Sequence, residues 1–269
     1  MPELPEMETY RQQLTPLIQG GTITGAEVSR PKSLNVEPER FVQALTGNRI
    51  VRIDRRAKHL LFLLATGDVL LLHLMLGGWM FYGTEEEKPD RTTQVEIHFD
   101  SKTLYFIGLR LGYLHLHALS DLEAHLSKLG PEPLDSGFTF EHFQQALKGK
   151  KSNLKVTLVD QAVLSGIGNC YSDEICFYAG LLPTRKVPSL NFEELNRLYQ
   201  AMRTVLLEAI SFGGYMESPL FIGDRLTGGF DERCRVYDRE GEPCVRCGHP
   251  LIKNEVSSRK CFYCANCQV

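Results

Sequence analysis

The sequence lacks a hydrophobic run long enough to cross a membrane. Its longest apolar segment, at 69–81, is interrupted by His73 and by the Gly77-Gly78 pair. A membrane helix needs roughly 18 uninterrupted apolar residues. The chain also lacks internal repeats, low-complexity tracts and a signal peptide ahead of its amphipathic start. We therefore expect a cytoplasmic protein without a membrane partner.

An excess of positive charge is missing as well. Thirty Lys and Arg face 33 Asp and Glu, which gives a net charge of −3, and the pI is about 6.3. Taken alone, this balance argues mildly against a nucleic-acid partner. Basic residues nevertheless gather at 49–58, at 147–155 and again between 235 and 260. Such stretches attract phosphates whatever the total charge, although each one alone is equally a solvated surface.

The start of the chain, MPELPEMETY, raises a question about its two prolines. Pro5 suits the first turn of a helix, and the glutamates around it complement the positive end of the helix dipole. Apolar residues then recur at helical spacing until Gly20-Gly21 ends the run. This helix explains Pro5 but gives Pro2 no role.

Strand-like segments dominate the rest of the first half. They alternate with period two or are rich in β-branched and aromatic residues, and turn residues such as Thr66-Gly67-Asp68 separate them. The segments are 22–30, 48–56, 59–65, 68–75, 93–99 and 103–109. Because no crossover helices lie between them, they predict antiparallel pairing in a sandwich or barrel.

The second half is predicted to be helical. A capping box of Ser120 and Glu123 starts one helix, and Asn191 with Glu194 starts another that runs to about Ser211. Further helices are expected at 140–148, 152–161 and 168–179. With a chain of 269 residues, we predict an α+β protein. Its domains are an N-terminal helix plus antiparallel β-sandwich at 1–118, a helical domain at 119–232 with a flexible glycine-rich loop at 212–232, and a finger at 233–269.

Half of the eight cysteines form two CxxC pairs near the end of the chain: Cys244, Cys247, Cys264 and Cys267. This spacing predicts four thiolates around one tetrahedral Zn²⁺, with a β-hairpin between the pairs. The zinc is expected to be structural because four protein ligands leave no open position. Cys261 is a competing ligand by spacing, whereas Cys170, Cys176 and Cys234 are interpreted as buried thiols.

Three segments together resemble one family. MPELPEMET, DQAVLSGIGNCYSDEICFYAGLLP at 160–183 and the four-cysteine finger are similar to bacterial formamidopyrimidine-DNA glycosylase and its relative endonuclease VIII. The resemblance covers the whole chain in the right order. It implies a helix–two-turns–helix DNA-binding element in the helical domain. It also implies double-stranded damaged DNA as partner, a monomer, and a bacterial, nucleoid-associated location.

The resemblance gives Pro2 a role. Removal of Met1 exposes a secondary amine, and an α-amino group has a pKa of about 8, so part of it is unprotonated at neutral pH. Such an amine forms a Schiff base with the sugar C1′ of a damaged nucleotide and expels the base. Glu3 is then the general acid/base. Glu6 is assigned to the same pocket, with a helix-dipole role as the alternative.

Further site residues follow from the family pattern. Lys58, in RRAKHLLF, matches a lysine that faces the lesion, and Arg259 matches the finger arginine that grips phosphates. Asn169, in GIGNCY, starts a helix whose N–H groups and amide hold a phosphate. Structural and DNA-contacting interpretations stay equally open for four more residues: His73, Lys151, Lys155 and Tyr237.

The chain departs from the family where a flipped base leaves a hole in the duplex. The family fills this hole with a methionine, an arginine and a phenylalanine. Here Leu76, Leu109 and Leu111 occupy the aligned positions. Arg110 takes the arginine role only if the register slips by one residue. Since an arginine donates to the acceptors of cytosine, its loss predicts an altered preference for the base opposite the lesion.

Three functions are therefore weighed. The leading one is a bifunctional DNA glycosylase with strand-cleaving lyase activity on oxidised or ring-opened bases. The alternative is a catalytically weak or inactive paralogue that binds damaged, abasic or bent DNA, which the missing wedge residues motivate. A zinc-ribbon interaction protein on an unrelated scaffold is disfavoured by the first 60 residues.

Overall fold

The computed structural model describes the whole chain, Met1–Val269. The chain divides into two compact units. The N-terminal unit consists of Met1–Ser127 and Phe212–Gly229, and the helical unit consists of Lys128–Ser211 and Phe230–Val269. These bounds differ from the expected ones. The loop predicted at 212–232 joins the N-terminal unit over most of its length, and the finger clusters with the helices.

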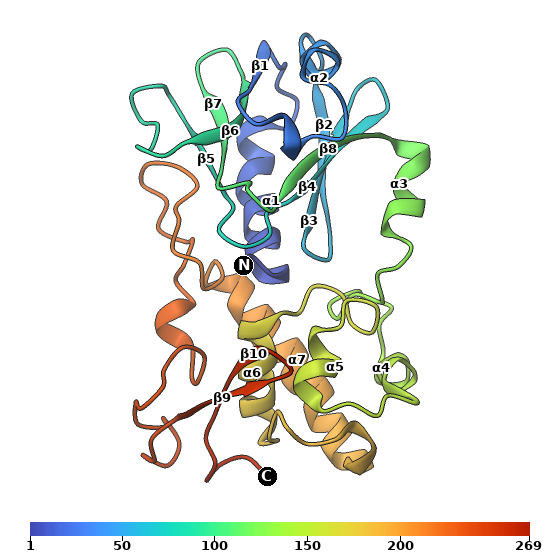
Figure 1. Ribbon diagram of the computed structural model, residues 1–269, viewed down its shortest axis with the longest axis vertical. Coiled ribbons are helices and arrows are strands. Elements are labelled where there is room, and N and C mark those ends of the chain that lie inside the picture. The colour runs from blue at the N-terminus through green and yellow to red at the C-terminus, as the bar shows by residue number, and fades with distance from the viewer. The chain divides into compact units, whose positions relative to one another are not determined.

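The predicted antiparallel sandwich is confirmed in the N-terminal unit (Figure 1). One four-stranded sheet has the order β2 (Ile50–Arg56), β3 (His59–Leu64), β4 (Asp68–His73), β8 (Tyr113–Ala118). The other has the order β1 (Gly25–Val28), β6 (Thr93–His98), β7 (Thr103–Ile107), β5 (Trp79–Gly83). All neighbouring strands are antiparallel. The inner faces of both sheets and α1 (Leu4–Ile18) form one apolar core.

Helix α1 begins as its sequence predicts. Glu3 is the N-cap, and a reciprocal capping box joins it to Glu6. Met7, Tyr10 and Leu14 are buried in the core, which fixes the helix against the sheets. As a consequence the residues just before the helix, Pro2 included, are held in place.

Three elements escaped the sequence analysis: α2 (Pro38–Leu45), β5 and β8. Helix α2 starts with Pro38 and buries only Phe41 and Leu45, so its apolar stripe is too short to recognise. Strand β8 alternates Leu114 and Leu116 with aromatic residues. Its period-two pattern was readable but adjoins the start of a helix.

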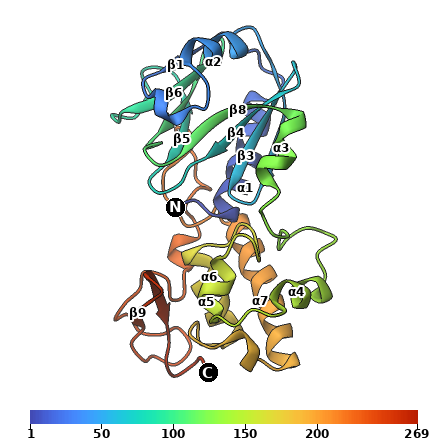
Figure 2. The ribbon, with the colours of Figure 1, turned by 45° about the vertical axis from the view of Figure 1, so that its right-hand side comes forward.

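Helix α3 (Leu119–Leu126) covers the outer face of the β2-β3-β4-β8 sheet (Figures 1 and 2). Leu122 packs there against Leu61 and Leu71, so β3 and β4 are buried on both faces and read as continuous apolar runs. The expected capping box at Ser120 is absent, because Ala118 is the N-cap and Ser120 lies inside the helix.

Four helices form the helical unit: α4 (Phe140–Leu147), α5 (Leu154–Val159), α6 (Asn169–Ala179) and α7 (Phe192–Ser211). Gly180 ends α6 in the left-handed conformation, which only glycine adopts readily. The predicted cap of α7 is confirmed, since Asn191 Oδ1 accepts the Glu194 N–H at 2.9 Å. Short 3₁₀ turns are η1 (Pro31–Ser33), η2 (Val187–Ser189) and η3 (Asp231–Arg233). No helix of the protein is long and apolar enough to span a membrane.

The finger contains the expected hairpin. Strands β9 (Ile252–Val256) and β10 (Arg259–Tyr263) pair antiparallel. Ser257 and Ser258 form the turn with positive φ angles. Arg259 is therefore the first residue of β10 and follows directly on the turn.

The glycine-rich segment 212–229 is held by its own hydrogen bonds. Asp224 accepts the Thr227 hydroxyl at 2.6 Å and the Leu220 N–H at 2.9 Å, and it also accepts the Gln13 side chain at 2.8 Å. Leu220 in turn accepts the backbone N–H of Tyr82 on β5. These contacts explain why a segment without periodicity belongs to the N-terminal unit.

Candidate active site and metal centre

The start of the chain is a buried acidic segment of the N-terminal unit, which we take as the candidate active-site pocket. Pro2 is buried, and Glu3 and Glu6 are 1% and 3% exposed. Glu6 is held from two sides, because its carboxylate accepts the Glu3 N–H at 2.7 Å and the Tyr215 N–H at 2.9 Å. Glu6 therefore takes part in the capping box of α1 and also ties the chain start to the 212–229 segment, while its assignment to the active-site pocket stays a prediction.

Lys58 lies at the tight turn that joins β2 to β3 and is 5% exposed. Desolvation lowers the pKa of its ammonium, while the charges of Glu3 and Glu6 act through space in the opposite direction. A lysine with a lowered pKa exchanges protons at a pH closer to neutrality. Pro2, Glu3 and Lys58, predicted from distant parts of the sequence, thus belong to one unit, and two of them interact electrically.

His73 ends β4 beside two other aromatic residues. Its ring is stacked on Tyr113 with centroids 5.7 Å apart and contacts His59 edge-on at 4.6 Å. His59 Nε2 lies 3.0 Å from the Tyr113 hydroxyl. Burial lowers the pKa of His73 to about 3, and the neighbouring His59 and Lys58 add to this. Its Nδ1 accepts the Met75 N–H at 3.2 Å, so the neutral ring orients the loop that follows β4.

The predicted wedge positions divide into exposed and buried side chains. Leu76 and Leu111 are 66% and 63% exposed, whereas Leu109 is fully buried. The backbone of Leu109 is held by Gln94 at 2.9 Å and by Ser33 at 3.1 Å. A hollow of about 750 Å³ lies beside the exposed pair, lined also by Trp79 and Arg110. The segment 108–112 joins β7 to β8, and the guanidinium that it exposes is that of Arg110.

In the helical unit, Lys155 is not a surface residue. It is fully buried, and its Nζ lies 2.7 Å from Asp173 Oδ1 and 2.8 Å from the carbonyl oxygen of Asn169. The DNA-contacting interpretation of Lys155 is therefore wrong, because both of its strong contacts are inside the protein. Its role is to fix the first residue of α6, Asn169, which keeps its predicted place at a helix start.

The neighbours Asp173 and Glu174 hold the finger on α6. Glu174 is buried and accepts three backbone N–H groups, from Arg235, Val236 and Tyr237, at 2.8 to 2.9 Å. Asp173 Oδ2 accepts the Phe262 N–H at 3.1 Å. The ring of Tyr237 packs against Phe262 with centroids 5.4 Å apart. This contact gives Tyr237 a structural role beside its predicted contact with DNA.

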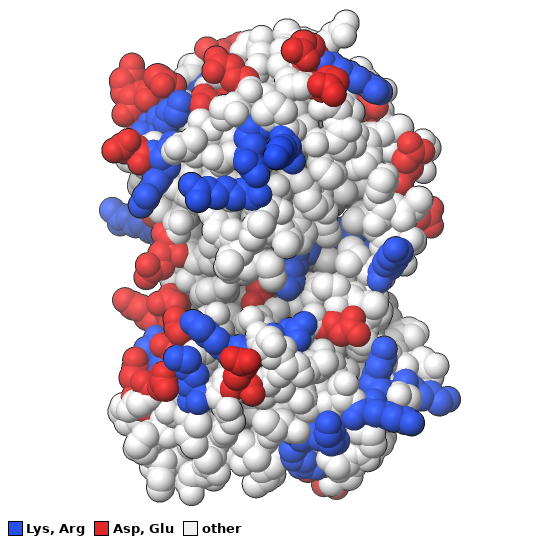
Figure 3. All heavy atoms as spheres, in the orientation of Figure 1, with Lys and Arg blue, Asp and Glu red and all other residues white.

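Arg259 remains exposed at the start of β10, and its guanidinium contacts only the carbonyl oxygen of Ser257. Lys151 is exposed in the segment between α4 and α5. Figure 3 shows Lys and Arg side chains gathered over this part of the helical unit with few acidic ones among them. The basic stretch 147–155 thus presents positive charge even though the whole chain is acidic.

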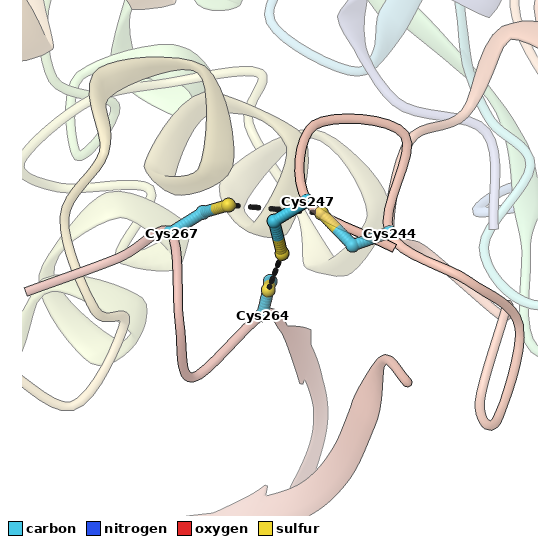
Figure 4. A group of neighbouring side chains, drawn as sticks. All are labelled: Cys244, Cys247, Cys264 and Cys267. Carbon is cyan, nitrogen blue, oxygen red and sulfur yellow. Dashed lines mark hydrogen bonds between the residues drawn. The ribbon is translucent and has the colours of Figure 1, made fainter. Parts of the chain in front are cut away.

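The four predicted zinc ligands come together (Figure 4). Their sulfur atoms all lie within 4.8 Å of one another, with Cys244 and Cys267 3.9 Å apart and Cys247 and Cys264 3.5 Å apart. Four sulfurs at 2.3 Å from a tetrahedral zinc are separated by about 3.8 Å. The residues therefore fit one structural zinc ion. Cys261 is not a ligand, since it is buried against Asp173.

The other three cysteines, Cys170, Cys176 and Cys234, are buried as expected. The sequence analysis missed two features of the site. The ion pair of Lys155 with Asp173 joins positions 18 residues apart, a separation that carries no periodic signal. The contact of Tyr215 with Glu6 depends on a loop whose path nothing in its sequence reveals.

Three family models match the chain. They describe a formamidopyrimidine-DNA glycosylase N-terminal domain at residues 1–113, a formamidopyrimidine-DNA glycosylase H2TH domain at 129–218, and a zinc finger found in FPG and IleRS at 241–269. The formamidopyrimidine-DNA glycosylase of Thermus thermophilus is 39% identical, and the match covers 100% of this chain and 98% of the relative. That of Carboxydothermus hydrogenoformans is 35% identical over the full length of both chains.

Solved structures show the same fold over the same length. Lactococcus lactis Fpg in complex with DNA containing N7-benzyl-Fapy-dG matches with a TM-score of 0.92 at 29% identity, covering 99% of both chains. The complex of that protein with DNA containing an abasic site also gives a TM-score of 0.92, at 28% identity. All three segments that carried the resemblance lie within the matched regions. The chain therefore belongs to the formamidopyrimidine-DNA glycosylase family.

Proposed function

We propose that the protein is a bifunctional DNA glycosylase and abasic-site lyase of base excision repair, acting on oxidised or ring-opened bases. Pro2 is the nucleophile once Met1 is removed. The observation that supports this most strongly is the pocket at the chain start, where Pro2 lies beside Glu3 and Lys58 has a lowered pKa. Perturbed titratable groups around a nucleophile are typical of catalytic sites.

The covalent steps follow from the chemistry of a secondary amine. The neutral nitrogen of Pro2 attacks C1′ of the damaged nucleotide; the bond from C1′ to the base breaks, and the base leaves with a proton. The nitrogen then loses its own proton, and the bond from C1′ to the ring oxygen breaks as that oxygen is protonated. The resulting iminium is positively charged and acidifies C2′. Loss of the C2′ proton expels the 3′ phosphate and cleaves the strand.

Two side chains of the pocket suit the proton transfers. Glu3, as a carboxylate next in sequence to Pro2, takes the proton from the nitrogen and returns it to the ring oxygen. Lys58, with its lowered pKa, is neutral in a larger fraction of molecules than an exposed lysine and serves as a base for the C2′ proton. In this scheme Glu6 takes no part in the proton transfers. It positions Glu3 by accepting the backbone N–H of Glu3.

The helical unit supplies the grip on double-stranded DNA. Asn169 at the start of α6 offers backbone N–H groups and an amide to a phosphate. Arg259 binds phosphates around the lesion, and Lys151 adds to the positive field. Zinc contributes by holding the finger in shape. The proposed assembly is a monomer, and the proposed location is the bacterial nucleoid.

The exposed leucines suggest a tolerance for the base opposite the lesion. Leu76 and Leu111 wedge into the hole left by the flipped base, but a leucine donates no hydrogen bond. Leu109 cannot join them because it is buried. Arg110 is the donor next in sequence to Leu111, and the exposed Arg91 lines the same hollow. We therefore expect discrimination among the four opposite bases to be below about tenfold, unless Arg110 pairs with cytosine.

Borohydride trapping tests the function. Duplexes carrying 8-oxoguanine, a ring-opened purine or an abasic site, each opposite all four bases, are incubated with the trimmed protein and reduced. A covalent protein–DNA adduct, accompanied by strand cleavage without reduction, supports the proposal. The matched control is the chain that retains Met1, in which the Pro2 nitrogen is an amide and forms no adduct.

A second function has one observation in its favour. The buried Leu109 at the aligned arginine position fits a paralogue that binds abasic or bent DNA with little or no catalysis. Tight binding to abasic duplexes with no adduct at any pH, from trimmed protein, would establish that alternative and overturn the first.

A further inference from the structure

Tyr215 is the residue of the 212–229 segment that reaches the chain start. Its hydroxyl accepts a hydrogen bond from the Met1 amino group at 3.2 Å and donates one to the Met1 carbonyl oxygen at 3.2 Å. Its backbone N–H donates to Glu6 Oε1 at 2.9 Å. Both ends of Tyr215 are thus bound to the segment that carries Pro2.

Glycines bring this loop into place. Gly213 and Gly214 have φ angles of 75° and 73°, a region that favours glycine. A Cβ atom on Gly214 would lie 2.3 Å from Glu6 Oε1, closer than any side chain permits. The loop can approach Glu6 only if both residues are glycine. The sequence of the loop therefore fixes the position of Tyr215 beside the chain start.

Removal of Met1 changes the surroundings of the hydroxyl. Across a peptide bond, the carbonyl oxygen of Met1 is on the order of 2 Å from the Pro2 nitrogen. A hydroxyl 3.2 Å from this oxygen therefore lies within about 5.5 Å of that nitrogen. Trimming takes away the Met1 amino group and the Met1 carbonyl oxygen, which the Tyr215 hydroxyl contacts, and leaves a new terminal N–H on Pro2.

We infer that Tyr215 is a further catalytic residue, whose hydroxyl accepts a hydrogen bond from the N–H of trimmed Pro2 and so turns the nitrogen lone pair toward C1′. The inference rests on the proposed function, in which Pro2 is the nucleophile. No proton passes to Tyr215: the single N–H stays hydrogen-bonded to its hydroxyl while the bond to C1′ forms, and the proton goes to the Glu3 carboxylate only after the base has left. The hydroxyl acts by alignment, which is worth large factors in rate.

An acceptor beside an amine has a second consequence. It stabilises the protonated amine more than the neutral one, since hydrogen bonds to charged groups are the stronger kind. Tyr215 thereby raises the pKa of the Pro2 amine. Its removal should change two independent quantities, the maximal rate and the pH at which the amine becomes reactive.

The test is Tyr215→Phe, which keeps the ring and removes the hydroxyl. Single-turnover borohydride trapping on an abasic duplex is measured from pH 5 to 9. We expect the plateau rate to fall about tenfold and the acid limb to move by about one pH unit downward. The matched control is Tyr105→Phe on β7, which loses a hydroxyl hydrogen-bonded to Glu85. Its plateau rate and acid limb should be those of the wild type.

A second measurement needs no activity. Carbon-13 NMR titration of the Pro2 ring gives the pKa of the amine directly, and this pKa should be lower in Tyr215→Phe. Should that variant fail to fold, 4-fluorophenylalanine at 215, which fills the space of the hydroxyl, cannot ionise and is a much weaker acceptor, should lower the pKa in the same direction. Identical pKa values with an unchanged rate profile overturn the inference. A wild type that forms no adduct overturns the proposed function instead, and the titration still decides the contact.

Discussion

Two buried lysines, one in each unit, show how differently the same residue is used. Lys155 is fully buried and paired, with Asp173 at 2.7 Å and the Asn169 carbonyl oxygen at 2.8 Å. Lys58 is almost as buried, but Glu3 and Glu6 act on it only through space, and its pKa is lowered by desolvation. Contact pairing makes the first a structural cation. Desolvation without contact gives the second a lowered pKa, on which its proposed role in proton transfer rests.

The comparison also separates stability from chemistry. Burial of an ionisable group costs free energy, and the protein offsets that cost at Lys155 with an ion pair and a hydrogen bond. At Lys58 the cost persists as a lowered pKa, whereas in the Lys155 pair it is seen on the acid, because burial raises the pKa of Asp173 to about 7. Breaking the Lys155 pair should therefore destabilise the fold. Removing the Lys58 side chain should instead slow the reaction without destabilising the fold.

The largest effect is expected from Asp173→Ala. The substitution leaves the Lys155 ammonium buried without its partner, which should lower the free energy of unfolding by about 3–5 kcal/mol. Urea denaturation measures this loss. Glu193→Ala, at an exposed position of α7, is the control and should change stability by less than about 0.5 kcal/mol.

The double variant Lys155→Met with Asp173→Leu sharpens the same prediction. Replacing both charges by apolar side chains removes the unpaired ion, so most of the lost stability should return. A single variant that loses less than about 1 kcal/mol would show that the pair is not what holds α5 against α6.

Lys58→Met should reduce activity and leave the stability of the fold intact. We expect trapping on abasic DNA to slow about 100-fold, while stability at pH 7 stays the same or rises. The pKa of Lys58 is lowered in the folded state, so between that value and the ordinary lysine pKa the unfolded chain binds more protons. The free energy of unfolding of the wild type therefore increases as the pH rises through this window. In the variant this increase is absent.

Denaturation curves between pH 7 and 10 measure that difference. Lys32→Met, at an exposed position of η1, should behave as the wild type in both assays. A Lys58→Met protein with full trapping activity would remove Lys58 from the chemistry.

A somewhat smaller effect is expected from His73, a third buried ionisable group. Its pKa is lowered from 6.5 to about 3, so below pH 6.5 the unfolded chain takes up a proton that the folded chain refuses. Stability is therefore lost as the pH falls. Between pH 6.5 and 4.5, His73→Asn should abolish about 2 kcal/mol of this loss. His249→Asn, at an exposed site in the finger, should leave the curve unchanged.

The smallest effect contrasts Lys155 with the exposed Lys151. Lys151→Ala should weaken binding to abasic duplexes a few-fold and reduce the slope of log affinity against log salt by about one. The double variant that replaces Lys155 and Asp173 should keep the full slope, because Lys155 meets no phosphate. A reduced slope in the double variant would restore Lys155 as a DNA contact.

The fold was predictable where signals are local and strong. Six of the eight strands of the sandwich, the start of α1, the cap of α7, the Gly180 stop and the two CxxC pairs all follow from residues near one another in sequence. Helix α2 was missed because only Phe41 and Leu45 mark its buried face. Ser120 misled for the opposite reason, since a capping sequence fell inside the first turn of the helix, two residues after the N-cap Ala118.

The candidate site was predictable only through the family resemblance. No local pattern distinguishes Lys58, which is buried, from Lys151, which is exposed, and burial decides their chemistry. Lys155 was left undecided because its partner Asp173 lies on another helix. Tyr215 could not be assigned at all, since its place depends on the path of a glycine-rich loop. Long-range contacts, invisible to periodicity, account for each failure.

The central claim is that the amine of Pro2 becomes covalently joined to deoxyribose. It is tested most directly by trapping trimmed protein on an abasic duplex with borohydride, digesting the adduct, and mapping the modified residue by mass spectrometry. We predict that the sugar remnant is found on the N-terminal proline, and that chain retaining Met1 gives no adduct. An adduct on a lysine, or none from protein shown to begin at Pro2, would contradict the account.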